Sequence, residues 1–155
     1  MVSSYQGHIQ EREREAYPRL RSFMSKSFLK IPADLDIYEA IALILKNQVS
    51  GAPVVDENGK LVGIISEKDC LRLATQDSYE SNPAGGPVRS YMTTEVLTVS
   101  PDMGLNELAH IFVSNPYKKL PVLDNGRLVG VVRRRDALAA IQEFYKKRMA
   151  YIHGH

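Results

Sequence analysis

The stretch that decides the fold is Leu61-Val62-Gly63-Ile64-Ile65-Ser66-Glu67-Lys68-Asp69, because nearly the same pattern returns as Leu128-Val129-Gly130-Val131-Val132-Arg133-Arg134-Arg135-Asp136. A shift of 68 residues also aligns Arg21-Ser22-Phe23-Met24 with Arg89-Ser90-Tyr91-Met92. Self-similarity over this length indicates that one structural unit occurs twice. The function therefore has to be sought in a pair of related sites.

Composition is typical of an ordinary globular protein and excludes several function classes. Of the 155 residues, 44% are apolar and 25% are charged, and the net charge is only +2. Such a balance favours neither a nucleic-acid binder nor a membrane-surface protein. A single cysteine, Cys70, excludes an internal disulfide framework and suits a reducing compartment. No apolar run approaches the roughly 20 residues that span a bilayer, so we expect a cytoplasmic protein.

The first repeat opens with a short apolar segment and a helix. We expect a strand over Phe28–Ile31, ended by Pro32, which cannot donate to a ladder. Asp36 and Glu39 form the pattern of a capping box, in which two side chains satisfy the free amides that open a helix. Apolar residues at helical spacing follow, so one face of this helix should be buried against a sheet.

A hairpin and a second helix complete the repeat. Residues 52–55 and 61–65 are two apolar runs joined by a turn that contains Asn58-Gly59, the strongest short hairpin signal. A second helix is expected from Glu67 to about Thr75. The second repeat should hold a strand over Val96–Val99, a helix over Met103–Ser114, a hairpin with strands 120–123 and 128–132, and a long last helix from Arg134.

These elements predict an α+β fold with the following division of the chain. Residues 1–16 form an N-terminal extension with a lead-in helix over Ile9–Arg21, 17–76 the first repeat, 77–87 a linker, 88–143 the second repeat, and 144–155 a helical extension and tail. The extension carries aromatic and aliphatic residues among bases, which suggests a docking surface.

The order strand, helix, strand, strand, helix, found twice with Pro-Val, Asn-Gly and Leu-Val-Gly in register, resembles the CBS-domain pair, named after cystathionine β-synthase. The resemblance covers about Tyr17–Glu143. It implies two β-α-β-β-α units packed about a pseudo-twofold axis, with two clefts for adenosyl ligands such as AMP, ADP, ATP or S-adenosylmethionine. It also implies a homodimer formed through helices, a regulatory function without catalysis, and an effector that is contacted in trans.

The first motif, Ser66-Glu67-Lys68-Asp69, matches the ribose and phosphate signature of that family. A carboxylate can accept hydrogen bonds from both vicinal hydroxyls of a ribose, and a helix N-terminus attracts phosphate. The alternative is that Ser66 is an N-cap and Asp69 an acidic first-turn residue, which a helix accepts without any ligand. Both interpretations stay open at this point.

The second motif departs from the signature, because Arg133 stands where Ser or Thr is usual and Arg134, Arg135 and Asp136 follow. Guanidinium groups at a helix N-terminus oppose the helix dipole, so a bound polyphosphate would give them a purpose. The alternatives are a solvated basic surface or, less favoured, a nucleic-acid contact through Arg133–Arg135 and nearby lysines.

The resemblance assigns further residues to the two clefts. The positions that meet the adenine edge or the phosphate correspond to Ala52 in the first repeat and to Lys119 and Leu120 in the second. The first strands are implied to reach across the pair, so one cleft should combine Ser66, Lys68, Asp69 and Ala52 with Thr98 and Met103. The other should combine Lys119, Leu120, Arg133, Arg135 and Asp136 with Lys30.

The first cleft thus suits adenosine or AMP, and the second suits a di- or triphosphate. No required cofactor, metal set or acid/base pair is indicated, so an enzyme is the weakest hypothesis. A ligand-free dimerisation scaffold remains the main rival. His110 should be a partly buried packing residue, and Cys70 either a buried apolar residue or a thiol with a lowered pKa.

Overall fold

The computed structural model describes residues 17–75 and 85–154, which fold as two compact units with an α+β architecture. Among the described residues, one unit, here unit 1, holds 17–26, 98–124 and 129–154. The other, unit 2, holds 27–75, 85–97 and 125–128. The expected lead-in helix up to residue 16 and most of the linker lie outside the described residues. The described end of that expected helix forms only a single 3₁₀ turn, η1 (Leu20–Ser22).

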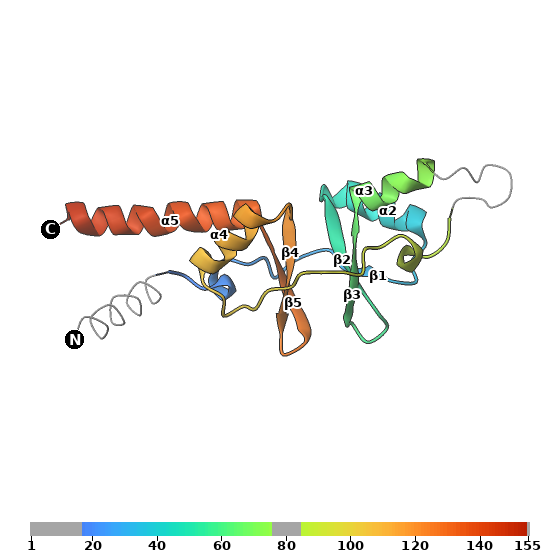
Figure 1. The fold of residues 1–155 in the computed structure, drawn as a ribbon, viewed down its shortest axis with the longest axis horizontal. Helices are drawn as coiled ribbons and strands as arrows, with labels where there is room; N and C mark the ends of the chain where they lie inside the picture. Colours follow the sequence, from blue (N-terminus) through green and yellow to red (C-terminus); the bar gives the residue numbers. More distant parts are fainter. Residues whose placement is uncertain (1–16, 76–84, 155) are drawn as a thin grey trace. The chain divides into compact units, whose positions relative to one another are not determined.

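Unit 2 is a small sheet covered by helices (Figure 1). Its strands pair in the order β1-β2-β3, with β1 parallel to β2 and β2 antiparallel to β3. The elements in chain order are β1 (Ile31–Pro32), α2 (Ile37–Asn47), β2 (Gly51–Val55), β3 (Leu61–Ser66), α3 (Glu67–Leu71) and the 3₁₀ turns η2 (Arg72–Ala74) and η3 (Val88–Ser90).

Unit 1 repeats this plan with a longer last helix. Its sheet consists of the hairpin β4 and β5, against which α4 and α5 pack. The elements are η1 (Leu20–Ser22), α4 (Leu105–Ser114), β4 (Lys119–Asp124), β5 (Arg127–Arg133) and α5 (Arg134–His153). In the part of the chain that the structure describes, no helix combines the length and the apolarity needed to cross a bilayer.

Local sequence signals explain where α2 begins and ends. The Asp36 carboxylate accepts a hydrogen bond from the backbone N–H of Tyr38 at 3.1 Å, so the acidic N-cap predicted from the sequence is present. Ile37, Ala40 and Ile44 lie on the buried face, at the spacing expected for one side of a helix. Gln48 ends the helix in the left-handed conformation, with φ 55°.

Both predicted hairpins are present, but their turns differ. In the second hairpin Asn125 and Gly126 both have positive φ, 51° and 79°, as a two-residue turn requires. In the first hairpin only Gly59 does, with φ 78°. There the Asp56 carboxylate accepts hydrogen bonds from the N–H groups of Asn58 and Lys60 at 2.9 Å each, which holds a longer turn.

The first strand was predicted too early in unit 2 and too long in unit 1. In unit 2 the strand is Ile31–Pro32 rather than Phe28–Ile31, and Pro32 belongs to it. The missing donor of Pro32 is tolerated at this edge strand, because the next residue, Ala33, donates to the carbonyl of Val55 at 2.9 Å. In unit 1 the expected strand Val96–Val99 reduces to one parallel bridge between Val99 and Val122.

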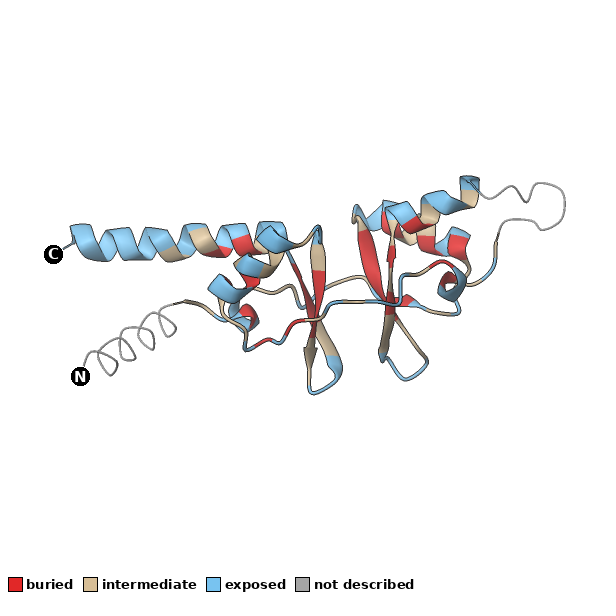
Figure 2. Cartoon of the chain, in the orientation of Figure 1, coloured by how far each residue is buried: buried red, intermediate tan, exposed pale blue. Residues whose placement is uncertain are grey.

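Each hydrophobic core is completed by the opening segment of the other repeat. Leu20 stands at the start of the first repeat, yet it is fully buried in the core of unit 1 together with Leu105, Leu108 and Val132. Val88 stands at the start of the second repeat and is fully buried in the core of unit 2. Figure 2 shows buried residues in red on the strands and helices of both units.

Backbone hydrogen bonds fix the exchanged segments in equivalent registers. In unit 1, Leu20 donates to the carbonyl of Met103 at 2.9 Å, and Ser25 exchanges two bonds with Val131. In unit 2, Val88 donates to the carbonyl of Leu35 at 2.8 Å, and Thr93 exchanges two bonds with Ile64. The duplicated sequence therefore folds into two similar units, each built from both repeats.

Candidate functional site

The first motif forms a reciprocal capping box at the junction of β3 and α3. The Asp69 carboxylate accepts hydrogen bonds from the Ser66 backbone N–H at 3.0 Å and from the Ser66 hydroxyl at 2.9 Å. In return, the Ser66 Oγ accepts from the Asp69 N–H at 3.1 Å. The cap interpretation of this motif is thus realised in the structure, and a capping role is compatible with ligand binding by the same residues.

Asp69 is nearly fully buried, with 3% of its surface exposed, although it carries a charge. A buried carboxylate requires several donors. Besides Ser66, the Thr93 hydroxyl donates to Asp69 Oδ1 at 3.3 Å, and the Arg72 guanidinium lies 3.8 Å from the same oxygen. Sequence reasoning missed Thr93 and Arg72. Thr93 could have been found, since the 68-residue shift aligns it with another hydroxyl residue, Ser25.

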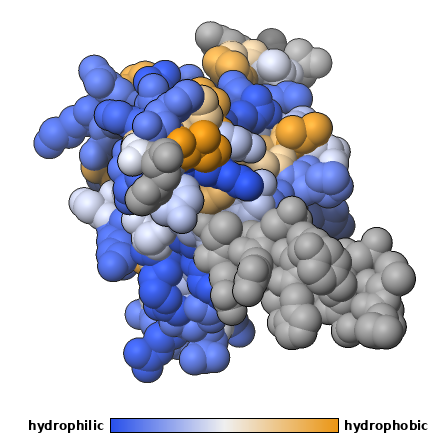
Figure 3. Space-filling view, turned by 90° about the vertical axis from the view of Figure 1, so that its left-hand side faces the viewer, coloured by the Kyte–Doolittle hydropathy of each residue, from blue (hydrophilic) through white to orange (hydrophobic). Residues whose placement is uncertain are grey.

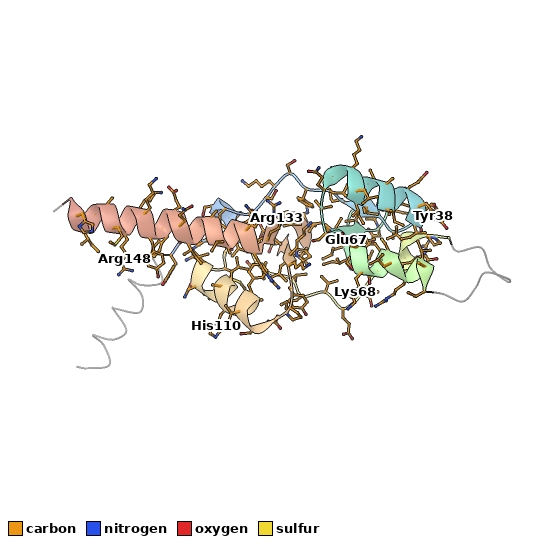
Figure 4. All side chains as sticks on the ribbon, turned by 90° about the horizontal axis from the view of Figure 1, so that it is seen from above. Tyr38, Glu67, Lys68, His110, Arg133 and Arg148 are labelled. Atoms are coloured by element: carbon orange, nitrogen blue, oxygen red, sulfur yellow. The ribbon has the colours of Figure 1, made fainter. Side chains whose placement is uncertain are left out.

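Two more predicted residues lie around this motif. Ala52 is buried on β2 and pairs with Ile65 across the hairpin, and its neighbour Gly51 pairs with Ser66. Lys68 is exposed on α3 and its side chain extends from the helix in Figure 4. Because α3 has only five residues, its macrodipole contributes little to any phosphate site. The candidate site here is a carboxylate and hydroxyl pair beside a β-strand.

In the second motif Arg133 and Asp136 form a two-pronged ion pair. The Arg133 Nε and Nη2 atoms donate to the two carboxylate oxygens at 3.2 and 3.1 Å, and the Arg133 backbone N–H donates at 2.8 Å. These hydrogen bonds raise the pKa of the Arg133 guanidinium. The side chain of Asp136 is 15% exposed. Its carboxylate is bound by the guanidinium of Arg133, whereas the Asp69 carboxylate is bound by hydroxyl groups.

The remaining bases of the second motif lie beside this ion pair. Burial lowers the pKa of Lys119, the positive charge of Arg133 lowers it further, and Asp136 partly opposes both effects. The Arg134 Nε donates to the carbonyl of Tyr117 at 2.8 Å, and Arg135 is exposed. The guanidinium groups of Arg133 and Arg134 therefore both bind acceptors within the chain. This weakens the hypothesis of a nucleic-acid contact through Arg133–Arg135.

Three of the other residues assigned to the clefts, Thr98, Met103 and Lys30, belong to the unit opposite the motif of their cleft. Thr98 and Met103 are partly buried in unit 1, and Met103 packs on its core. Lys30 is exposed in unit 2, with its Nζ 5.6 Å from the centre of the Phe28 ring. Leu120 is buried in the core of unit 1. The assignment of these residues to shared clefts stays a prediction.

A hollow of about 530 Å³ lies within unit 1. Its walls come from the lead segment, including Tyr17 and Phe23, and from one face of α5, including Asp136 and Phe144. The Tyr17 and Phe144 rings stack with centroids 4.8 Å apart. Asp136 thus borders a hollow inside its own unit.

Two residues outside the motifs differ in part from expectation. His110 is exposed on α4, and Figure 4 shows its side chain on the outer side of the helix, so its prediction as a partly buried residue was wrong. Cys70 is partly buried, and burial together with the charges of Asp69 and Glu67 raises the pKa of its thiol. These effects disfavour a thiolate at Cys70. The described residues contain no cluster of three or more metal-binding side chains.

Comparison with known proteins supplies the family. A family model for the CBS domain matches residues 20–75 and 88–143. The uncharacterized protein MJ1426 of Methanocaldococcus jannaschii is 33% identical over 152 residues, covering 79% of this chain and 90% of that protein. Other curated relatives are longer, and the chain spans 40%, 15% and 25% of the length of three of them.

Solved structures agree with this match. CBSX2 from Arabidopsis thaliana in complex with AMP superimposes with a TM-score of 0.73 and 25% identity, covering 82% of this chain and 98% of that chain. The CBS domain pair of protein MJ0100 in complex with 5'-methylthioadenosine and S-adenosyl-L-methionine gives a TM-score of 0.69 and 26% identity, with the same coverage. The chain therefore belongs to the CBS domain family and carries two copies of the domain.

Proposed function

We propose that this chain is a regulatory module that binds an adenosyl ligand, acts as a homodimer in the cytoplasm, and influences an effector protein in trans. The observation that carries the proposal is the buried carboxylate of Asp69, held beside the Ser66 hydroxyl at the end of a strand. Similar proteins have been solved with AMP, or with 5'-methylthioadenosine and S-adenosylmethionine, all of which contain an adenosine-type ribose.

The chemistry of the Asp69 site suits a ribose. Most internal hydrogen bonds of Asp69 reach Oδ2, whereas Oδ1 receives only the longer bond from Thr93 and the distant Arg72. A vicinal diol that replaced these weaker partners would give the buried carboxylate two charge-assisted hydrogen bonds. The Ser66 and Thr93 hydroxyls can rotate and would remain available to the ligand.

The basic cluster around Lys119 and Arg133 suits an anionic ligand group. Charged Lys119 is disfavoured by its surroundings, and the exposed Arg135 adds a further positive charge nearby on α5. A phosphate group would relieve this repulsion, so we assign the more highly phosphorylated ligand to the second site. Regulation additionally requires that the ligand bind one arrangement of the protein better than another.

Replacing Asp69 with asparagine should separate the ligand function from the cap function. Asn retains one acceptor oxygen for the Ser66 N–H but loses part of the hydrogen bonding of the capping box, so Asp69→Asn should cost about 1 kcal/mol of stability. It loses the charge that a diol would bind, so affinity for AMP should fall by about 10- to 100-fold. Isothermal titration calorimetry with AMP, ADP, ATP and S-adenosylmethionine, together with thermal unfolding, measures both effects.

Asp36→Asn is the control, because it also removes a charge from a helix start, at the N-cap of α2, but Asp36 belongs to neither motif. It should leave the affinity unchanged. Equal affinity in Asp69→Asn and wild type, or no binding of any of the four ligands to wild type, would instead support the ligand-free scaffold. The fully satisfied capping box of Ser66 and Asp69 is the observation that favours this rival.

The affinity for ATP at the second site should decline as the pH rises. This decline should occur at a lower pH than it would if Lys119 had the pKa of an ordinary lysine. Burial and Arg133 lower the pKa of Lys119 below its usual 10.5, and a bound phosphate favours its charged form. Binding should therefore take up a proton, and affinity should decline as the pH rises through the lowered pKa. Titrations in buffers of different ionisation enthalpy measure the uptake. The Lys119→Met variant should show none, and an unchanged uptake in it would contradict the assignment.

A further inference from the structure

The aspartate of each motif forms an ion pair with an arginine, but the two arginines come from opposite sides of the motif. In the first repeat the partner is Arg72, three residues after Asp69, and its Nη1 atom lies 3.8 Å from Asp69 Oδ1. In the second repeat the partner is Arg133, three residues before Asp136, and its Nε and Nη2 atoms donate to the two carboxylate oxygens. The two repeats therefore place positive charge differently around equivalent carboxylates.

The second repeat has no counterpart of the Arg72 charge. Aligning the two motifs places Ala139 at the position of Arg72, and residues 137–142 are all uncharged. The next bases on α5, residues 146–148, lie about 15 Å or more along the helix from Asp136. They lie toward the end of α5, and Figure 3, which views the side on which α5 ends, shows mainly hydrophilic residues in blue. A guanidinium one turn after the aspartate is thus specific to the first repeat.

The Arg72 guanidinium is held loosely and is accessible. Its side chain is 60% exposed, whereas the side chain of Asp69 is 5% exposed. The distance of 3.8 Å between the guanidinium and the carboxylate is longer than a hydrogen bond. Because a guanidinium has five N–H donors, it can turn toward a bound molecule without breaking a strong contact. Arg72 can therefore act on a ligand as well as on Asp69.

The charge of Arg72 lies next to the oxygen that a ribose would use. Asp69 Oδ2 already accepts two hydrogen bonds from Ser66, whereas Oδ1 has only the longer bond from Thr93 and the ion pair with Arg72. Residues three apart lie on the same side of a helix, so a diol bound at Oδ1 would lie beside the guanidinium. The 5' group of the same nucleoside would then lie within roughly 10 Å of the guanidinium, which is about one Debye length.

The other charges of α3 do not cancel the charge of Arg72. Lys68, four residues before Arg72, is exposed and adds a second positive charge on this side of the helix. Glu67 is also exposed, but it lies about 160° away from Asp69 around the helix axis. The surface around Arg72 therefore presents a net positive charge to a ligand that approaches Asp69.

The charge of the 5' group distinguishes the adenosyl ligands that similar proteins hold. AMP carries a phosphate with a charge of roughly −1.5 to −2, 5'-methylthioadenosine an uncharged thioether, and S-adenosylmethionine a sulfonium cation. A positive charge about 8 Å away, at an effective dielectric constant of about 40, changes the affinity by about five-fold for each unit of ligand charge. Arg72 should therefore favour AMP, leave 5'-methylthioadenosine nearly unaffected and disfavour S-adenosylmethionine.

We propose that Arg72 sets the charge preference of the Asp69 site, so that this site selects an adenosyl ligand with an anionic 5' group over one with a cationic 5' group. The inference rests on the proposed function, because it requires that Asp69 bind a ribose. It adds the residue that chooses among such ligands. Arg72 acts through its charge and is a specificity-determining residue, whereas Asp69 holds the sugar that all of these ligands share.

The first test measures the affinities for AMP, 5'-methylthioadenosine and S-adenosylmethionine by isothermal titration calorimetry, in an Asp136→Asn background that weakens the second site. Arg72→Gln should lower the affinity for AMP by about 10-fold, raise that for S-adenosylmethionine by about 3-fold, and change that for 5'-methylthioadenosine by less than about 2-fold. Arg72→Lys keeps the charge and should retain the order of the three ligands. Lys60→Gln is the matched control, since Lys60 is an exposed base of the same unit about 20 Å from Ser66 along β3.

The outcomes separate this inference from the proposed function. An unchanged ratio of the AMP and S-adenosylmethionine affinities in Arg72→Gln overturns the inference. An equal loss of affinity for all three ligands also overturns it, because Arg72 would then have a purely structural role. In both cases the proposed function stands if Asp69→Asn weakens the binding that the wild type shows. If the wild type binds none of the three ligands, the proposed function and this inference both fail.

The second test measures how the affinities depend on sodium chloride between about 0.05 and 0.5 M. The AMP affinity of the wild type should fall as salt screens the attraction, and the fall should be shallower in Arg72→Gln. The affinity for uncharged 5'-methylthioadenosine should change little in either protein, which controls for general effects of salt. The same slope for AMP in both proteins would show that the Arg72 charge does not reach the ligand, and would overturn the inference.

Discussion

Replacing Leu20 with alanine should lower the free energy of unfolding by about 3 kcal/mol, as expected for a fully buried leucine. Leu20 stands at the start of the first repeat but has no exposed surface in the core of unit 1, where it packs with Leu105 and Leu108. The loss should therefore appear in unit 1. Urea unfolding measures the total effect, and hydrogen exchange should show the largest loss of protection in α4 and β5.

Leu71→Ala is the control, since Leu71 is 68% exposed and its truncation should change stability by less than about 0.5 kcal/mol. A fragment of residues 88–155 extends the same test. It contains the whole second repeat but lacks Leu20, so it should remain unfolded. A cooperative unfolding transition in this fragment would contradict the requirement for the exchanged segment.

Replacing Gly63 with valine should destabilise the protein by about 2–3 kcal/mol, because the added atoms overpack a rigid site. A Cβ atom at Gly63 would lie 2.8 Å from the backbone carbonyl oxygen of Thr93, closer than van der Waals contact permits. Thr93 cannot move away easily, since it exchanges two backbone hydrogen bonds with Ile64. Gly130→Val should have a similar effect, because its Cβ would lie 2.9 Å from the Ser25 carbonyl oxygen.

Gly59→Asn serves as the control for both glycine variants. Gly59 has a positive φ of 78°, but a Cβ atom added there would meet no atom within 4 Å, and Asn tolerates this conformation. Its cost should stay below about 1 kcal/mol. Chemical denaturation of the three variants gives the comparison. If Gly63→Val were no more costly than Gly59→Asn, the close approach of β3 to the Thr93 segment would not constrain the fold.

Local signals in the sequence were sufficient for much of the fold. The acidic cap at Asp36, the helical spacing that follows it and the two Asn-Gly turns each depend on residues close in sequence, and the corresponding elements are present. The first strands were misplaced because their pairing is too short to leave a pattern. Ile31–Pro32 makes one two-residue ladder, and Val99 makes a single bridge.

The exchange of segments could not be read from the sequence. Leu20 and Val88 are apolar in either arrangement, and only long-range hydrogen bonds such as that from Leu20 to Met103 decide which core each residue joins. For the site, the motif itself located Ser66 and Asp69. The hydroxyl of Thr93 lies 24 residues away from Asp69, and no local pattern connects the two. The fork of Arg133 on Asp136 was likewise missed, because bases in that position suggested an outside anion.

The exchanged lead segment also affects the order of events during synthesis on the ribosome. Unit 2 is contiguous from Ser27 to Leu97 apart from a short turn, so nearly all of it emerges before α4. The Arg19 guanidinium donates a hydrogen bond to the backbone carbonyl of Asp102, which is synthesised 83 residues later. At about 5–20 residues per second, the nascent chain keeps this N-terminal stretch without its docking site for several seconds. Translation pauses or chaperones that act in this interval would affect the yield of folded protein more than its final stability.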